Sequence, residues 1–117
     1  MIFATVIASV VLALVSAGSG IPKVIGTEQM VNEAKHLGVP RAGYVIIGSL
    51  ELAAAVGLLA GLAKAPIGIA AAAGMVLMMI GAVAGHARAG DRLAAMAPAL
   101  TVGVASAITL GLRLATA

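Results

Sequence analysis

Four long stretches of this sequence carry almost no charge. Residues 1–22, 65–85 and 93–112 have no charged side chain, and residues 42–63 have one, Glu51. Each stretch has about 20 residues, the length of an α-helix that spans a hydrocarbon core roughly 30 Å thick. In lipid, only helices and closed barrels satisfy every backbone group. We therefore predict transmembrane helices over residues 2–21, 42–62, 66–86 and 93–114.

Composition supports a membrane protein. Hydrophobic residues make up 62% of the 117 residues and charged residues 9%, against about 25% charged residues in a typical soluble domain. A soluble fold of this length leaves much of its surface wet and has no room to bury so much apolar area. The net charge of +3 comes from scattered Lys and Arg, and only 2% of residues are aromatic, so it does not indicate a nucleic-acid partner. Membrane lipid is the expected surrounding, and nucleic acid is excluded as a ligand.

The connections predict how the spans are arranged. The last two connections are short, which favours sequential antiparallel neighbours. We predict an all-α fold: one integral membrane domain over residues 1–117, with four helices running up-down-up-down. Between the first two spans we expect a short interfacial helix over residues 28–37, because Thr27 suits an N-cap and Gly38 a left-handed end. Residues 15–18 resemble a signal-peptidase site, but no basic residue precedes them, so we expect the first span to be retained.

Basic residues predict an orientation for the bundle. Four spans place both termini on one side, together with Lys64 and with Arg113, which we assign to the tail. The opposite side holds five basic residues: Lys23, Lys35, Arg41, Arg88 and Arg92. Since cytoplasmic loops are enriched in Lys and Arg, the bias puts loops 23–41 and 88–92 in the cytoplasm and both termini outside.

Small residues recur at four-residue spacing in three of the spans. Lipid provides no hydrophobic force between helices, so close helix approach depends on such residues. The helix-packing candidates are Ala53, Gly57 and Gly61 in the second span, Gly81 and Gly85 in the third, and Gly103 and Ala107 in the fourth. They serve packing within the bundle or form the face of a homodimer; the first interpretation is favoured.

Glu51 is the one charged residue deep inside a predicted span. A carboxyl group at that depth usually faces the interior of the bundle. Helical spacing places Tyr44, Gly48, Ala55 and Leu58 on the same stripe as Glu51. Two interpretations stay open. Glu51 belongs to a ligand or proton site in an internal cavity, or it is a protonated carboxyl that hydrogen-bonds to a neighbouring helix because burial disfavours its charged form.

Few side chains qualify as partners of Glu51. Lys23 and His86 lie at the ends of the first and third spans, and we expect neither to reach Glu51 unless that end of the bundle is indented. His86, Arg88 and Asp91 form a second cluster that suits an anionic ligand or a lipid head group, or serves only as interfacial anchors with Asp91 as an N-cap. A lone His without a nearby Cys or second His is a poor metal site, so we assign no metal.

Several short motifs match a known family in order and spacing. They are Gly20-x-x-Lys23, Leu37-Gly38-Val39-Pro40, Ile47-Gly48-x-x-Glu51-Leu52, Pro66-x-Gly68-x-Ala70-Ala71, Gly81-Ala82 followed by His86-x-Arg88-x-Gly90-Asp91, and Pro98. Over about residues 18–100 the chain resembles the DoxX-like family of small bacterial four-helix membrane proteins. The resemblance implies a bacterial cytoplasmic (inner) membrane location. The family is named after a subunit of a thiosulfate:quinone oxidoreductase, which implies a redox-linked accessory role.

Two functional hypotheses follow. The chain has no Cys and no catalytic constellation, so we expect no catalytic activity of its own and no intrinsic cofactor. The leading hypothesis is an accessory or assembly partner of a membrane complex. The alternative is a binding or redox-accessory subunit that holds a quinone, a lipid or another lipophilic molecule near Glu51. It requires a cavity that reaches Glu51; tight packing of the fourth helix against Glu51 would exclude it.

The ligand-binding candidates under the second hypothesis are Glu51, Tyr44, Lys23, His86, Arg88 and Asp91. A third hypothesis is a proton-coupled transporter. The short chain and its single buried charge disfavour that hypothesis unless the protein oligomerises.

Overall fold

The computed structural model describes residues 1–117 as five helices joined by short turns. The helices are α1 (Ile2–Ile25), α2 (Glu28–Leu37), α3 (Arg41–Ala60), α4 (Ala65–Arg88) and α5 (Leu93–Thr116). The four long helices are apolar enough to cross a membrane. The predicted all-α fold with four spans is therefore confirmed, and the short helix has the predicted bounds.

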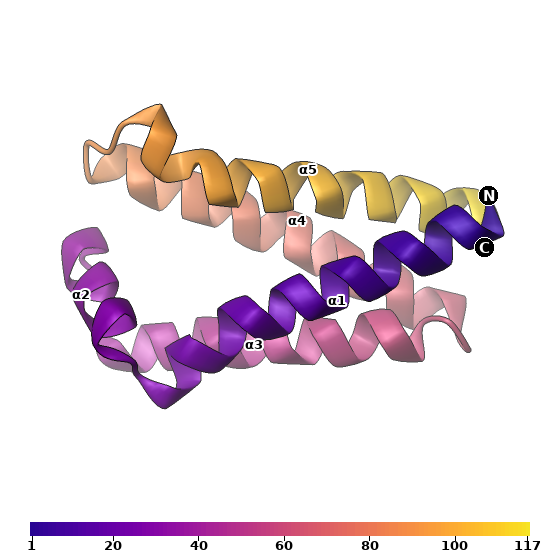
Figure 1. The fold of residues 1–117 in the computed structure, drawn as a ribbon, viewed down its shortest axis with the longest axis horizontal. Helices are drawn as coiled ribbons and strands as arrows, with labels where there is room; N and C mark the ends of the chain where they lie inside the picture. The colour runs from indigo at the N-terminus through magenta and orange to yellow at the C-terminus, as the bar shows by residue number, and fades with distance from the viewer.

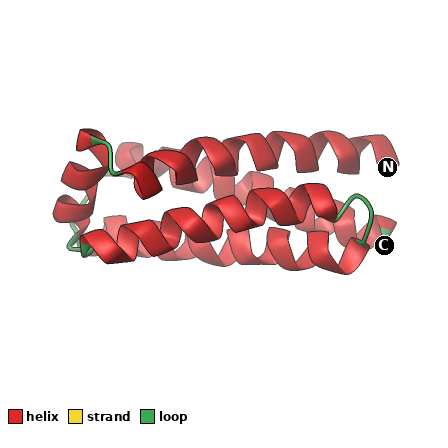
Figure 2. Cartoon of the chain, turned by 90° about the horizontal axis from the view of Figure 1, so that it is seen from below, coloured by secondary structure: helices red, strands yellow, loops and turns green.

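The long helices form a closed ring in which α1 packs against α3, α3 against α4, α4 against α5, and α5 against α1. Both termini lie at one end of the bundle, beside the turn between α3 and α4 (Figure 1). The short helix α2 lies across the opposite end, near the turn between α4 and α5 (Figures 1 and 2). Toward that end α1 diverges from α5, so the bundle is wider at α2 than at the termini.

The first helix is one turn longer than the sequence predicts. Its expected end was residue 21, but it continues through Pro22 to Ile25. Proline removes one hydrogen-bond donor, and in the last turn this leaves the rest of the helix intact. Gly26 then ends the helix in the left-handed conformation, with φ 81°. Arg41 donates to the last free carbonyls, with distances of 2.7 Å to Lys23 O and 3.1 Å to Val24 O.

The long helices expose apolar side chains on the outside of the bundle and place small or hydroxylated residues inside it, as expected for helices surrounded by lipid. Many large apolar side chains are exposed on the outside of the bundle, as in Phe3 and Leu14 of α1. The inward face of α1 consists mainly of small or hydroxylated residues: Thr5, Ser9, Leu12, Ala13, Ser16 and Gly20. Such a face lets helices approach closely and lets hydroxyl groups bond within the bundle.

Two glycines set the distance between α1 and α3. A Cβ atom on Gly20 would lie 2.7 Å from Gly48 O, and a Cβ atom on Gly48 would lie 2.7 Å from Gly20 O. The two helices therefore touch backbone to backbone at this crossing. The crossing lies beside Glu51, whose own Cβ is 3.1 Å from the Gly20 position.

The crossing predicts that Gly20→Ala destabilises the protein by about 1–3 kcal/mol, because the added methyl overpacks a backbone contact. Thermal unfolding of the purified protein in detergent measures the effect. Gly111→Ala is the matched control, since nothing lies within 4 Å of its Cβ position. A Gly20→Ala protein as stable as the Gly111→Ala protein would contradict the close crossing.

Candidate functional site

A large cavity opens inside the wide end of the bundle. Its volume is about 890 Å³, and residues of all five helices line it. Lys23, Tyr44, Glu51 and His86 are among the lining residues, so four of the six ligand-binding candidates meet at one cavity. Arg88 and Asp91 do not line it. The wide end of the bundle is thus hollow. This is the indentation that we expected to be necessary for Lys23 or His86 to reach Glu51.

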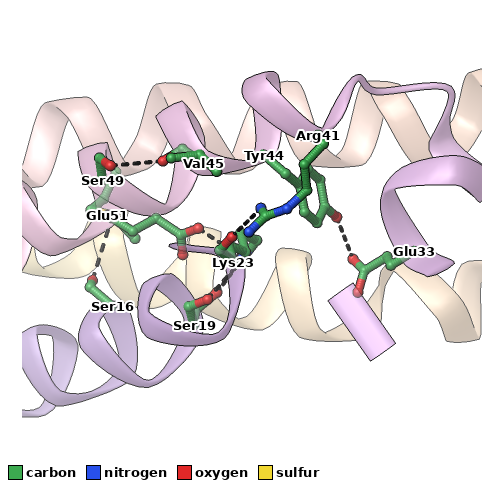
Figure 3. A network of polar contacts seen from close by, with 10 residues as sticks. Ser16, Ser19, Lys23, Glu33, Arg41, Tyr44, Val45, Ser49 and Glu51 are labelled. Carbon is green, nitrogen blue, oxygen red and sulfur yellow. Dashed lines mark hydrogen bonds and ion pairs between the residues drawn. The ribbon is translucent and has the colours of Figure 1, made fainter. Parts of the chain in front are cut away.

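The partner of Glu51 is Lys23. The Lys23 ammonium lies 2.8 Å from Glu51 Oε1, and the two side chains point toward one another from α1 and α3 (Figure 3). The Glu51 side chain is 1% exposed and that of Lys23 14%. The ammonium also contacts Ser19, one turn earlier in α1, at 2.7 Å from Oγ and 3.2 Å from the backbone oxygen. The extra turn of α1 places Lys23 in this helical register.

Both oxygens of the Glu51 carboxylate are buried and have no hydrogen-bond partner; Oε1 has the ion-pair contact with Lys23, and Oε2 has no contact of either kind. The nearby Ser16 hydroxyl does not supply one, because it donates to Met75 Sδ at 3.5 Å. A buried acceptor without a donor destabilises the folded state by about 1–3 kcal/mol. Glu51 therefore has one oxygen, Oε1, in an ion pair and one oxygen, Oε2, that lacks a donor.

Tyr44 connects the cavity to α2. Its hydroxyl donates to Glu33 Oε1 at 2.8 Å, and the Lys23 ammonium lies 5.8 Å from the centre of its ring. Glu33 is not among the ligand-binding residues predicted from the sequence. The only signal available was its place on an amphipathic helix, which does not predict a contact with another helix.

A histidine pair bridged by one carboxylate holds the other side of α2. Asp91 Oδ1 lies 2.5 Å from His36 Nε2 of α2, and Asp91 Oδ2 lies 2.6 Å from His86 Nδ1 of α4. The hydrogen bonds from His86 and from His36 lower the pKa of Asp91 below its ordinary value of 3.8. The predicted role of Asp91 as an N-cap is wrong, because Arg92 precedes α5 and no side chain caps it. Arg88 is exposed and stays outside the cluster.

Arg113 is the main residue that the sequence misplaced. It was assigned to the tail, but it is buried between α3, α4 and α5 at the end opposite the cavity. Its guanidinium donates to Leu58 O near the end of α3 and packs against Gly61 and Gly68. A signal was present: Arg113 continues a stripe of polar residues at helical spacing, with Ser106 and Thr109, that is buried.

The helix-packing candidates fall into three groups. Gly57, Gly61 and Gly103 lie against neighbouring helices, at Ala71, Gly68 and Met79 respectively. Ala53 and Ala107 are exposed on the outside of the bundle. Nothing lies within 4 Å of the Cβ positions of Gly81 and Gly85, and both residues line the cavity. These two glycines leave space inside the bundle.

Removing one partner of the ion pair is expected to destabilise the protein more than removing both. Lys23→Met or Glu51→Leu alone leaves a buried charge without a partner, which costs about 3–5 kcal/mol. The double variant removes both charges and should recover most of that loss. Unfolding measurements on the four proteins test the coupling, with Lys64→Met at an exposed turn as the control. Additive effects would show that the two charges do not interact.

The Asp91 bridge predicts a pH window for the docking of α2. An acid with a lowered pKa stabilises the fold above its unfolded pKa, and this contribution is lost as the pH falls through the folded pKa. Hydrogen exchange of residues 28–37 should therefore stay slow from neutral pH down to the ordinary value of 3.8 and accelerate only below it. Asp91→Ala should accelerate it at neutral pH, and Arg88→Ala should not. Equal protection in both variants would contradict the bridge.

Comparison with known protein families identifies the family of this chain. The model of the DoxX-like family matches residues 7–109, which is most of the chain and includes every residue of the cavity. No curated protein and no solved structure gives a significant match. With four spans and a family match of this extent, the chain is a multi-pass membrane protein that belongs to the DoxX-like family.

Proposed function

We propose that this protein binds a small lipophilic molecule in the cavity at the wide end of its bundle. The observation that carries the proposal is a cavity of about 890 Å³ with one buried ion pair, Lys23–Glu51, in its wall. Binding sites for small molecules are typically about 300–1,000 Å³, mostly apolar, with a few polar groups that orient the ligand. The ion pair is the group that would orient the ligand here.

The remaining walls suit an apolar ring or chain. Met75, Met78 and Met79 of α4 line the cavity opposite α1, together with apolar side chains such as Ile47 and Val102. Methionine side chains are flexible and polarizable, so they adapt to ligands of irregular shape and make favourable contacts with aromatic rings. A lipid or a ring compound of the quinone–hydroquinone class is the kind of molecule that we propose. The unpartnered oxygen of Glu51 supports a ligand with a polar head at that point.

An accessory or assembly role in a membrane complex was the favoured interpretation of the sequence. The cavity shifts our preference to the ligand hypothesis, which requires a cavity at Glu51. Glu51 lines the cavity, and α5 is not among the helices that pack against α3. The two roles are compatible, since a subunit that carries a ligand can also assist a larger complex. Partnership with a membrane protein or a second copy of the chain stays a prediction.

We further propose that the cavity end of the bundle faces the cytoplasm of a bacterial inner membrane. The basis is the excess of Lys and Arg at that end, where α2 and the turn between α4 and α5 lie together (Figure 1). Both termini lie at the other end of the bundle and would face outward. The ligand would then be held near the cytoplasmic surface.

Filling the cavity should abolish ligand binding without unfolding the protein. Gly85→Leu adds a side chain where nothing lies within 4 Å, and the residue lines the cavity. Gly74→Leu is the matched control on α4, because its Cβ position is also open but lies outside the cavity. Mass spectrometry of small molecules extracted from the purified proteins should find a lipophilic ligand in the wild type and in Gly74→Leu. We expect at least a tenfold depletion in Gly85→Leu, about the effect of losing 1.4 kcal/mol of binding free energy. Equal recovery from both variants would refute binding in the cavity.

A further inference from the structure

The hydrogen-bond donors beside Glu51 are already in use. A lysine ammonium has three N–H groups. Lys23 donates to Ser19 Oγ and to Ser19 O, and its ammonium lies 2.8 Å from Glu51 Oε1 as an ion pair. The Tyr44 hydroxyl has a single hydrogen, which it donates to Glu33 Oε1. Lys23 and Tyr44 therefore already face acceptors of the protein itself, and not the polar head of a ligand.

The unpartnered hydrogen-bonding position in the cavity wall is an acceptor of Glu51. Glu51 Oε2 is buried in the cavity wall and has no partner. His86 also lines the cavity, and its Nδ1 faces Asp91 Oδ2 at 2.6 Å. Because a carboxylate only accepts hydrogen bonds, Nδ1 of His86 donates to Asp91 and is not available to a ligand. A donor in the ligand would satisfy Glu51 Oε2.

We propose that the cavity selects a ligand with an aromatic hydroxyl head, as in a phenol or hydroquinone, over the matching ether or quinone. This inference rests on the proposed function and specifies the ligand of that same site. A hydroxyl group donates to Glu51 Oε2 and satisfies a buried acceptor, whereas an ether or carbonyl oxygen brings a further acceptor to it. Lys23 already neutralises Glu51, so the head needs no charge, and an ammonium head would be repelled by Lys23.

The aromatic part of the ligand follows from the cavity wall that α4 forms. Met78 and Met79 line the cavity on α4, and neither takes part in a side-chain hydrogen bond. Thioether sulfur atoms make favourable contacts with aromatic rings, often at the ring edge. A phenol ring placed between this wall and Glu51 would use both features, whereas an aliphatic alcohol would use only the acceptor.

The test compares two ligands that differ only in the donor. The full-length protein in lipid nanodiscs is titrated with para-nonylphenol and with para-nonylanisole, its methyl ether, and binding is followed by calorimetry. A hydrogen bond to a charged acceptor should make the phenol bind about tenfold to a hundredfold more tightly than the ether. Decanol, which has a hydroxyl group but no ring, should bind more weakly than the phenol. Equal binding of decanol and the phenol would overturn the proposal that the cavity selects an aromatic head.

Variants assign the preference to Glu51. Glu51→Gln offers an amide in place of two acceptor oxygens, so the preference should fall to about threefold or less. The double variant Lys23→Met/Glu51→Leu removes the acceptor without leaving a charge unpaired, and it should show no preference. Glu28→Gln, at an exposed carboxylate outside the cavity, should keep the full preference.

The outcomes separate this inference from the proposed function. If the ether binds as tightly as the phenol in the wild type, the donor preference is wrong although the cavity still binds ligands. That result would indicate that a water molecule already satisfies Glu51. If neither compound binds, both proposals are overturned. A preference that survives in the double variant would also overturn the assignment to Glu51.

Discussion

The arrangement of this bundle depends on the buried ion pair between Lys23 and Glu51. A carboxylate near the middle of an apolar helix is unfavourable in lipid unless a cation lies beside it. The cation reaches Glu51 because α1 continues one turn past the predicted end and because Gly20 and Gly48 let α1 and α3 touch. Arg41 at the start of α3 then holds the carbonyls at the end of α1. The extra turn of α1, its close crossing with α3 and the Arg41 cap therefore all help to bring Lys23 to Glu51.

The two ends of the bundle are built in different ways. At the end that holds the termini, the Arg113 side chain fills the space between three helices and donates to the backbone of α3, with Gly61 and Gly68 making room for it. At the other end the helices diverge, and the space is left open under α2. The helices are thus tightly packed at the end that holds the termini, and they enclose a cavity under α2 at the other end.

The short helix is held at both sides of the cavity by polar contacts. Glu33 accepts a hydrogen bond from Tyr44 of α3, and His36 shares Asp91 with His86 of α4. Three of these groups, Glu33, Tyr44 and His86, also line the cavity, so the contacts that position α2 belong to the same site as the ligand. Closing the cavity and orienting a polar head are therefore coupled by shared side chains. This coupling is a physical reason for the amphipathic composition of α2.

Sequence alone determined the spans, the bounds of α2 and the stripe of Tyr44, Gly48, Glu51 and Leu58, all of which are buried. These features follow from composition, caps and the periodicity of a single helix, which are local properties of the chain. The partner of Glu51, the buried position of Arg113 and the bridge at Asp91 were decided only by the tertiary structure. They depend on how each helix is rotated and shifted against its neighbours. Many small side chains set that geometry together, and no short motif records it.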